Sequence, residues 1–538
     1  MSFKNFIMIT TFFFFSIINT FCCEPSVASH NEEARIVAKE VFNLGGNSVD
    51  AFIAAVLAEY VVAPGVTSLA GSLSVLTGTN KGKSEHLDAE FNDPIDPNGQ
   101  WTEGEKIGKM IFAPAAPKGL YELWKKHGHL KWEKIINPAI HLAENGFIIN
   151  ELYASLLKLH EKKLRNSSHA FKTFFKDGKL KSAGEKLRLP LVSKTLQAFR
   201  NQGADYFYTG DWSRKFLERV RSLGGKLSQN DLLSYQAKFS EPLRMTLFNH
   251  DVLLPSYRNH SAAWIAAALK LSAKLKLNPN THYTESVPEL TKLLSIQRVL
   301  NSESWLTQTS ILDSKSKILK QLKGNQLERM WLLTQLEGAP KKTPLRGSHS
   351  YHTVTADCHG SFTSGTHTIN TLPWGEAIFV GGIPLATAGD LRAFATQPGE
   401  RRLSGMSPWV IQDSSTKTWK FAGGSFGASL KESSFQIITN ILRYGHSALS
   451  AISKPRFGTH PIDWSSFLQK LDSNWIDKRI SQEIRESIFK SQGIKLIADP
   501  YGGDLGPNSI IESQKNGSFK AAWSLSLGND TRPIEKNQ

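Results

Sequence analysis

The sequence contains little cysteine. Three cysteines occur among 538 residues, and two of them, Cys22 and Cys23, lie at the end of an apolar N-terminal run. If a leader is removed after this pair, the mature chain keeps only Cys358, and an internal disulfide is excluded. We therefore expect the hydrophobic core, rather than disulfides, to stabilise the fold.

The apolar run at the N-terminus is short. It covers residues 6–21, and Thr, Ser and Asn interrupt it, whereas a membrane-spanning helix needs about 20 apolar residues. Lys4 precedes the run and small residues follow it, which predicts a secretory signal over residues 1–24. The alternatives are retention as a short anchor and lipidation at Cys22 or Cys23. In each case we expect an exported chain that is periplasmic, extracellular or anchored on the outer side of a membrane.

Signatures of several other protein classes are missing. The sequence has no nucleotide-binding glycine motif, no zinc-finger spacing, no RNP-like aromatic motif and no internal repeat. Its formal charge of +16 would suit an anionic partner, and much of this charge lies in residues 158–189. Without a recognition motif, we interpret it as a Lys-rich surface and expect no nucleic-acid partner.

One cluster of histidines invites a metal interpretation. It consists of His349, His352, Cys358, His359 and His367. Their spacing fits no standard Cys/His zinc motif, and strand alternation would direct the side chains to both faces of a sheet. We therefore expect no metal and no cofactor.

Helical patterns dominate the first part of the chain. Ser29 with Glu32 forms a capping-box pattern that predicts a helix start, and Gly45–Gly46 predicts where this helix ends. Asn47 is expected to cap a second helix, whose apolar residues lie on nearly all sides and predict burial. Gly146 predicts the end of a later helix.

Hairpin patterns dominate the second part. Residues 351–370 alternate around a turn near His359–Gly360, which places residue 350 opposite residues 368–369. "WVIQD" followed by "KTWKFAGG" predicts a second hairpin, and Asn516–Gly517 predicts the turn of a third. Because helices and antiparallel hairpins alternate in blocks rather than as strict βαβ units, the sequence predicts the α+β class.

A polar, basic stretch, "EGAPKKTPLRGSH", leads directly into Ser350 at the start of a strand. Two interpretations fit this arrangement. The chain is cut there and Ser350 becomes a new N-terminus, or the stretch is only a loop that enters a sheet.

Five blocks occur in order between about residue 27 and residue 525: "ASHNEEARIVAKEVFNLGGNSVDA", "GLYELWKKHGHLKWEKIINPAIHLAENGF", "FYTGD…GGKLSQNDLLSYQAKFSEPLR", "SYHTVTADCHGSFTSGTHTIN" and "LSGMSPWV…FAGGSFGASL". Together they resemble the gamma-glutamyltransferase (glutathione hydrolase) family of N-terminal nucleophile enzymes. The resemblance implies a four-layer αββα sandwich, made as a precursor that cuts itself. A large segment, residues 25–349, and a small segment, residues 350–538, would then form one intertwined domain.

The resemblance also assigns catalytic roles. Ser350 stands where the family has its threonine nucleophile, and cleavage between His349 and Ser350 frees an α-amino group. With a pKa near neutrality, this group acts as general base for the same hydroxyl. Thr368 matches the threonine that hydrogen-bonds the nucleophile. Gly427 matches one of the two adjacent glycines whose N–H groups form the oxyanion hole, and Ala428 replaces the other.

The residues that the resemblance implies for substrate binding match the family pattern only in part. Asn370 matches a residue that holds the α-amino group of the substrate, and Ser404 matches a contact to its carboxylate. Gly405 replaces the second serine of the same motif. Asp390 is the acidic remnant of a family run that is otherwise missing here.

Glu90 reverses the charge of the site. It stands where the family carries the arginine that binds the glutamyl α-carboxylate, and a carboxylate there repels what the arginine would have paired. Three explanations remain open: a different amide substrate, a replacement by Arg392, Arg401 or Arg402, or loss of catalysis.

We expect a self-processing amidohydrolase or acyltransferase. It would cleave a gamma-glutamyl or related amide through an acyl-enzyme on Ser350 and pass the acyl group to water or an amine. The alternative is a catalytically degenerate secreted member that acts as a binding or structural protein. The expected partners are a small-molecule or peptide amide and the second chain of a heterodimer formed by self-cleavage, with membrane contact only through an N-terminal anchor.

Overall fold

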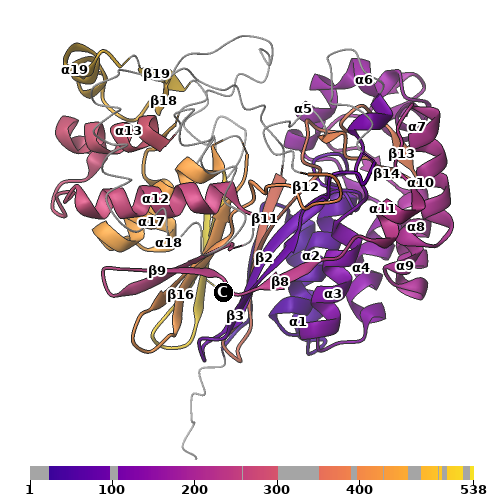
Figure 1. The fold of residues 1–538 in the computed structure, drawn as a ribbon, viewed down its shortest axis with the longest axis horizontal. Helices are drawn as coiled ribbons and strands as arrows, with labels where there is room; N and C mark the ends of the chain where they lie inside the picture. The colour runs from indigo at the N-terminus through magenta and orange to yellow at the C-terminus, as the bar shows by residue number, and fades with distance from the viewer. Residues whose placement is uncertain are drawn as a thin grey trace, which may run out of the picture.

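Two antiparallel sheets lie face to face at the centre of the molecule, and helices cover both outer faces (Figure 1). This is the four-layer αββα arrangement of class α+β that the sequence predicted. The computed structural model describes residues 23–96, 107–256, 258–300, 350–388, 397–427, 429–458, 474–494, 496–499, 506–524 and 534–537. His349, Arg392, Asp390 and Ala428 lie outside the described residues, as do residues 1–22 with the predicted leader.

The first sheet interleaves strands from both sides of residue 350. Its order is β1 (Ser26–Ala28), β11 (Ser350–Ala356), β12 (Ser361–Thr368), β2 (Ser72–Thr79), β3 (Ser84–Ala89) and β8 (Lys238–Ser240). The predicted hairpin of residues 351–370 is thus the β11–β12 pair, and it is inserted between β1 and β2. As a result, the start of β11 lies in the middle of the molecule.

The second sheet is built mainly from hairpins. Its order is β22 (Ile534–Asn537), β21 (Phe519–Trp523), β20 (Asn508–Ser513), β16 (Trp419–Ser425), β15 (Trp409–Asp413), β10 (His250–Leu254) and β9 (Leu243–Leu247). The predicted hairpins at "WVIQD…KTWKFAGG" and around Asn516–Gly517 are confirmed as β15–β16 and β20–β21.

The helices of the first outer layer come from the first part of the chain. They are α1 (Glu32–Asn43), α2 (Ser48–Val62), α3 (Ala116–His127), α4 (Trp132–Asn145), α5 (Glu151–Leu159), α6 (Glu161–Arg165), α7 (Ser168–Phe174), α8 (Pro190–Gln202), α9 (Asp205–Tyr208), α10 (Asp211–Ser222) and α11 (Gln229–Leu233). Short pairs accompany them: β4 (Phe147–Ile148) with β7 (Lys186–Leu187), β5 (Phe175–Lys176) with β6 (Lys179–Leu180), and β13 (Phe379–Val380) with β14 (Ile383–Pro384). The second outer layer contains α12 (His260–Lys274), α13 (Val287–Leu300), α17 (Leu430–Tyr444), α18 (Ala448–Ser453) and α19 (Gln482–Gln492), beside β17 (Phe457–Gly458), β18 (Asn474–Asp477) and β19 (Leu496–Asp499).

Helix α2 is the central helix of the first layer. Asn47 and Asp50 form a reciprocal capping box at its start, and every residue of the helix is buried, as its apolar composition predicted. The prediction that Ser29 caps α1 was wrong. Asn31 occupies the N-cap position, and the Ser29 hydroxyl instead donates to Glu59 Oε1 at 2.5 Å, because a buried carboxylate on α2 is the stronger acceptor.

A disulfide contradicts the expectation that the chain has no internal bridge. Cys23 is bonded to Cys358, with the two Cα atoms 5.6 Å apart across 335 residues of sequence. β1 runs antiparallel to β11, with Ser26 opposite Ala356, and this pairing brings Cys23 to the β11–β12 turn. A mature chain with this bridge must keep Cys23, whose thiol is then not available for a lipid.

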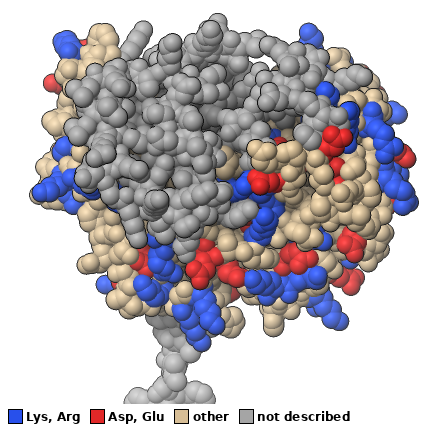
Figure 2. All heavy atoms as spheres, viewed as in Figure 1, with Lys and Arg blue, Asp and Glu red and all other residues tan. Residues whose placement is uncertain are grey.

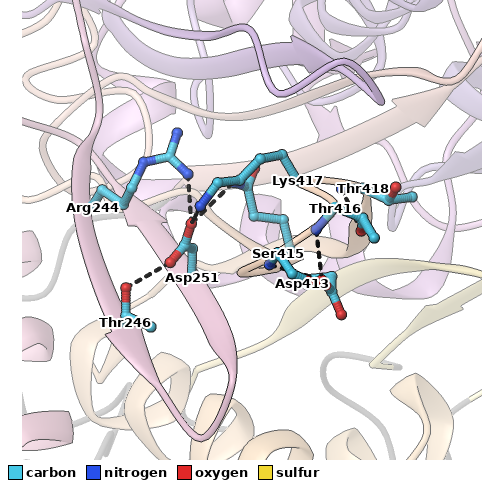
Figure 3. A network of polar contacts seen from close by, with 9 residues as sticks. Arg244, Thr246, Asp251, Asp413, Ser415, Thr416, Lys417 and Thr418 are labelled. Atoms are coloured by element: carbon cyan, nitrogen blue, oxygen red, sulfur yellow. Dashed lines mark hydrogen bonds and ion pairs between the residues drawn. The ribbon is translucent and has the colours of Figure 1, made fainter.

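The hairpin β9–β10 carries a buried acidic residue (Figure 3). Asp251 is about 1 % exposed and accepts hydrogen bonds from Arg244, Thr246 and Lys417, each 2.7–2.8 Å away. Burial raises the pKa of Asp251, but the hydrogen bonds, led by that of Lys417, outweigh it and lower the pKa to about 2. This network ties β10 to the β15–β16 hairpin.

The surface carries charges of both signs. Figure 2 shows Lys and Arg side chains interspersed with Asp and Glu over the lower part of the face in view. Within the described ranges, no helix is long and apolar enough to cross a membrane.

Candidate active site

A transverse row of side chains crosses the first sheet at one end. Ser350 opens β11 and lies opposite Thr368 of β12, which lies opposite Ser72 of β2. The hairpin pattern predicted residue 368 or 369 as the partner of Ser350, and the register confirms Thr368. Glu90 follows β3 at the position that extends the Leu73–Ala89 pairing by one residue, beside Ser72. Four strands therefore bring a serine, a threonine, a second serine and a carboxyl group together at one end of the sheet, which we call the active-site edge.

Strand alternation fixes the face on which this row lies. His352 points at the second sheet, because a Cβ on Gly424 of β16 would meet its ring within 3 Å. Val354 packs in the apolar cluster between the two sheets. Ser350 has the same parity as these two residues and therefore faces the second sheet. It is about 3 % exposed, and Thr368 is about 1 % exposed.

The backbone is unusually close beside Thr368. A Cβ on Gly71 would lie 2.0 Å from the Thr368 carbonyl oxygen, so only glycine fits there. Beyond the strand, Asn370 adopts φ of 60°, and its N–H donates to Thr368 Oγ1 at 2.8 Å. Gly71 and Asn370 therefore restrain the residue opposite Ser350 from two sides.

Glu90 is buried and belongs to this edge. Its Oε1 accepts hydrogen bonds from the Phe91 N–H at 3.0 Å and from Asn370 Nδ2 at 3.2 Å. Burial raises the pKa of Glu90 to about 7, and the nearby Asp88 carboxylate adds to the rise, although the Phe91 N–H opposes it. Asn370, which the resemblance matches to binding of the substrate amine, is thus hydrogen-bonded to Glu90, which stands where the family has an arginine.

The two described arginines proposed as replacements have other partners. Arg401 donates to the Glu90 carbonyl oxygen and to the Tyr235 hydroxyl, and its Nε lies 3.4 Å from Asp88 Oδ2. Arg402 lies 3.6 Å from Asp93 Oδ1, and its guanidinium covers the ring of Phe112. These contacts hold residues 400–402 against the end of β3.

The segment matched to the oxyanion hole follows β16. Ser364 Oγ donates to the Gly423 carbonyl at 3.0 Å, and Gly424 lies over His352, so β16 runs toward the end of β11 that carries Ser350. The next ring, Phe426, contacts Tyr351 with 5.5 Å between centroids. Gly427 then has φ of 86°, a conformation that favours glycine. Helix α17 begins three residues later, so its positive end lies close to this segment.

Ser404 and Gly405 lie at the start of α12. The Ser404 carbonyl accepts from the His260 N–H, and its hydroxyl accepts from the Met406 N–H at 3.2 Å. A Cβ on Gly405 would lie 3.1 Å from His260 Nε2. His260 therefore occupies space next to the position where the family motif has a second serine.

The histidine cluster is divided between two faces, as strand alternation predicted. His352 lies between the sheets and contacts the hydroxyls of Thr366 and Ser364 at 2.8 and 3.0 Å. His367 points the other way, toward α2, where its Nε2 lies 2.6 Å from Glu59 Oε2. The same carboxylate accepts two contacts of 3.0 Å from the Thr353 hydroxyl. With Cys358 in the disulfide, the described members of this cluster do not converge on one point.

Sequence reasoning missed two participants in the edge. Ser72 follows from the strand alternation of "SLSVLTG", but only the pairing of β2 with β12 shows that it lies beside Thr368. Asp88 appears in the sequence only as a neighbour of Glu90, and its contact with Arg401 spans 313 positions.

A four-layer sandwich in which a hydroxyl residue opens a central strand is the architecture of N-terminal nucleophile hydrolases. The profile of the family described as gamma-glutamyltranspeptidase matches residues 34–524. The chain belongs to this family, which is a family of enzymes.

Curated relatives and a solved structure agree with this assignment. The glutathione hydrolase proenzyme of Bacillus subtilis (strain 168) is 24 % identical over 544 residues, covering 92 % of this chain and 89 % of the relative. Glutathione hydrolase 2 of Arabidopsis thaliana is 23 % identical, covering 94 % and 92 %. The cephalosporin acylase of Bacillus halodurans shares the fold, with a TM-score of 0.76, 18 % identity and 96 % coverage of both chains.

Proposed function

We propose that the chain cuts itself between His349 and Ser350 and then acts as an amidohydrolase or acyltransferase with Ser350 as nucleophile. The placement of Ser350, opposite Thr368 on the inter-sheet face of a central strand, carries this proposal. It is supported by similarity to the glutathione hydrolase proenzymes of Bacillus subtilis and Escherichia coli.

The first step would be processing. The Ser350 hydroxyl attacks the carbonyl carbon of His349, the peptide shifts to an ester, and water cleaves the ester. The products are a carboxylate on the first chain and a free α-amino group on Ser350. Both chains would remain together as a heterodimer, because β11 and β12 are inserted between strands of the first segment.

The second step would be acyl transfer. The α-amino group of Ser350 takes the proton of its own hydroxyl, whose oxygen attacks the amide carbon of the substrate. The C–N bond breaks, the amine leaves with the proton, and the acyl group stays on Ser350 as an ester. Water or a second amine then releases it. N–H groups at Gly427 and Ala428 would stabilise the oxyanion, and the positive end of α17 would add to this effect.

The disulfide supports export. Bridges between distant parts of a chain persist in oxidising compartments and are rare in the cytosol. We therefore propose that the mature protein begins at or before Cys23 and lies outside the cytoplasm.

Intact mass and N-terminal sequencing of the purified protein would test the proposal. The expected result is a second chain that begins at Ser350 and is missing in Ser350→Ala. A chain that stays uncut after long incubation would refute self-processing, and a catalytically degenerate binding protein would then be the better interpretation.

A further inference from the structure

Two hydrogen-bond acceptors at the active-site edge are the carboxyl group of Glu90 and the hydroxyl of Ser72 beside it. Its carboxyl group is about 2 % exposed and lies on the row that contains Ser350 and Thr368. Ser72, between Thr368 and Glu90, is fully buried, and its hydroxyl lies next to the Glu90 carboxyl group, whose pKa it lowers by hydrogen bonding. A ligand group that enters beside Ser72 therefore meets a carboxyl group and a hydroxyl that are both buried.

Asn370 connects this acceptor cluster to the nucleophile. Its backbone N–H is bound to the Thr368 hydroxyl, and its side-chain Nδ2 is bound to Glu90. A substrate group beside Asn370 thus lies between the residue opposite Ser350 and the Glu90 carboxyl group. An anionic group at this point would face a second carboxylate, whereas an ammonium or amide N–H could donate to it.

The cations around this edge are engaged elsewhere. Arg401 binds Asp88, Tyr235 and the Glu90 carbonyl. Arg258 binds Glu400 at 2.7 Å and the Arg401 carbonyl. These pairings fix the two arginines to structural partners, whereas the Glu90 carboxylate is hydrogen-bonded directly to Asn370.

We propose that this site selects amides whose acyl group presents an ammonium or other hydrogen-bond donor, and no carboxylate, beside Asn370 and Glu90. The inference rests on the proposed function, because it concerns the acyl donor of the same active site. The implied substrate class is an amide of an ω-amino acid rather than one of glutamate or glutarate.

Three chromogenic p-nitroanilides of matched chain length separate the contribution of the substrate ammonium group from that of its carboxylate. The gamma-glutamyl compound carries both an α-ammonium and an α-carboxylate, the 4-aminobutyryl compound lacks the carboxylate, and the glutaryl compound lacks the ammonium. At about pH 8.5, where Glu90 is ionised, we expect kcat/KM for the 4-aminobutyryl compound to exceed that for the glutaryl compound at least about ten-fold. A ratio of one or below would overturn the inference.

Two substitutions test whether Glu90 sets this ratio. Glu90→Arg should reverse the preference toward the glutaryl compound, and Glu90→Gln should reduce it while keeping an acceptor for the Phe91 N–H. Glu400→Gln removes one negative charge from an exposed side chain outside the row, and it should leave the ratio unchanged. An unchanged ratio in both Glu90 variants would also contradict the inference, and Glu90→Gln decides if Glu90→Arg does not fold.

Failure of the proposed function can be distinguished from failure of the charge preference. If intact mass shows an uncut chain that forms no acyl-enzyme, the nucleophile assignment fails. Calorimetric binding of 4-aminobutanamide and of the monoamide of glutaric acid to the same protein then tests the charge preference without turnover. Tighter binding of 4-aminobutanamide supports the inference, and equal or weaker binding refutes it.

Discussion

Replacing Cys358 with serine would test both the disulfide and the proposed cut. The bridge closes a loop of 335 positions, and the entropy of such a loop in the unfolded chain gives an upper value of about 6 kcal/mol. Measured bridges contribute about 2–5 kcal/mol. We therefore expect Cys358→Ser to lower the free energy of unfolding by about 2–5 kcal/mol in the uncut Ser350→Ala background, measured by denaturant unfolding.

In the processed protein the same bridge has a second consequence. After a cut before Ser350, Cys23 would lie in the first chain and Cys358 in the second, so the bridge would join the two products of the proposed self-cleavage. Denaturing electrophoresis without reductant should show one species of full length, which separates into two chains when reductant is added. Cys358→Ser should show two chains under both conditions.

A cut wild-type protein that separates without reductant would refute this reasoning. The leader would then have been removed after Cys23, and the pairing of the structure would not occur in the mature chain. Cys22→Ser is the matched control, because it removes the neighbouring thiol and should leave the chains joined.

Four further predictions concern buried charge and backbone contact. Because burial raises the pKa of Glu90 to about 7, the folded wild-type protein binds a proton that the unfolded chain releases near pH 4.5. Its free energy of unfolding should therefore fall by about 3 kcal/mol as the pH rises from 4.5 to 7, and Glu90→Gln should remove this fall. Gly71→Ala should abolish cleavage, seen by mass, because its Cβ would displace the carbonyl of Thr368. Glu59→Ala should cost about 3–5 kcal/mol in denaturant unfolding, because His367 and the hydroxyls of Ser29 and Thr353 lose a buried acceptor. Asp251→Asn should cost about 2 kcal/mol at pH 7, a loss that disappears as the pH falls from about 4 to 2 through the lowered pKa of Asp251.

Two of these predictions have a matched control variant. Gly445→Ala strains a residue with φ of 66° but meets no neighbouring atom, so it should lower stability slightly and leave cleavage intact. Glu59→Gln keeps an acceptor and should cost less than alanine. A flat pH profile for wild-type stability, or normal cleavage in Gly71→Ala, would show that the corresponding contact does not act as described.

Much of the fold could be predicted from local patterns. The helix cap at Asn47, the glycines that end α1 and α4, and the alternation of β11–β12 each depend on a few neighbouring residues, and the structure shows each of them. The capping role of Ser29 failed because Glu59, thirty residues away, accepts from its hydroxyl.

The site was less accessible to sequence reasoning. Ser350, Thr368 and Asn370 lie in one hairpin, so their proximity follows from a single register. The bond between Asn370 and Glu90 and that between Cys23 and Cys358 join segments 280 and 335 positions apart. Such contacts depend on which strands are neighbours, and strand order across the β2–β12 boundary is not encoded in any local pattern.

The row at the sheet edge explains how the catalytic scaffold and the specificity of the pocket can vary independently. Ser350, Thr368 and Ser72 are placed by backbone ladders, and the tight approach of Gly71 to Thr368 fixes the ladder between them. Glu90 lies one residue beyond β3, where side-chain contacts rather than ladder bonds set its position. On the proposed specificity, a change of charge at residue 90 would therefore alter which acyl group is accepted without moving the hydroxyl of Ser350. The same reasoning requires that variants of Glu90 change the preference among acyl groups while the cut before Ser350 still occurs.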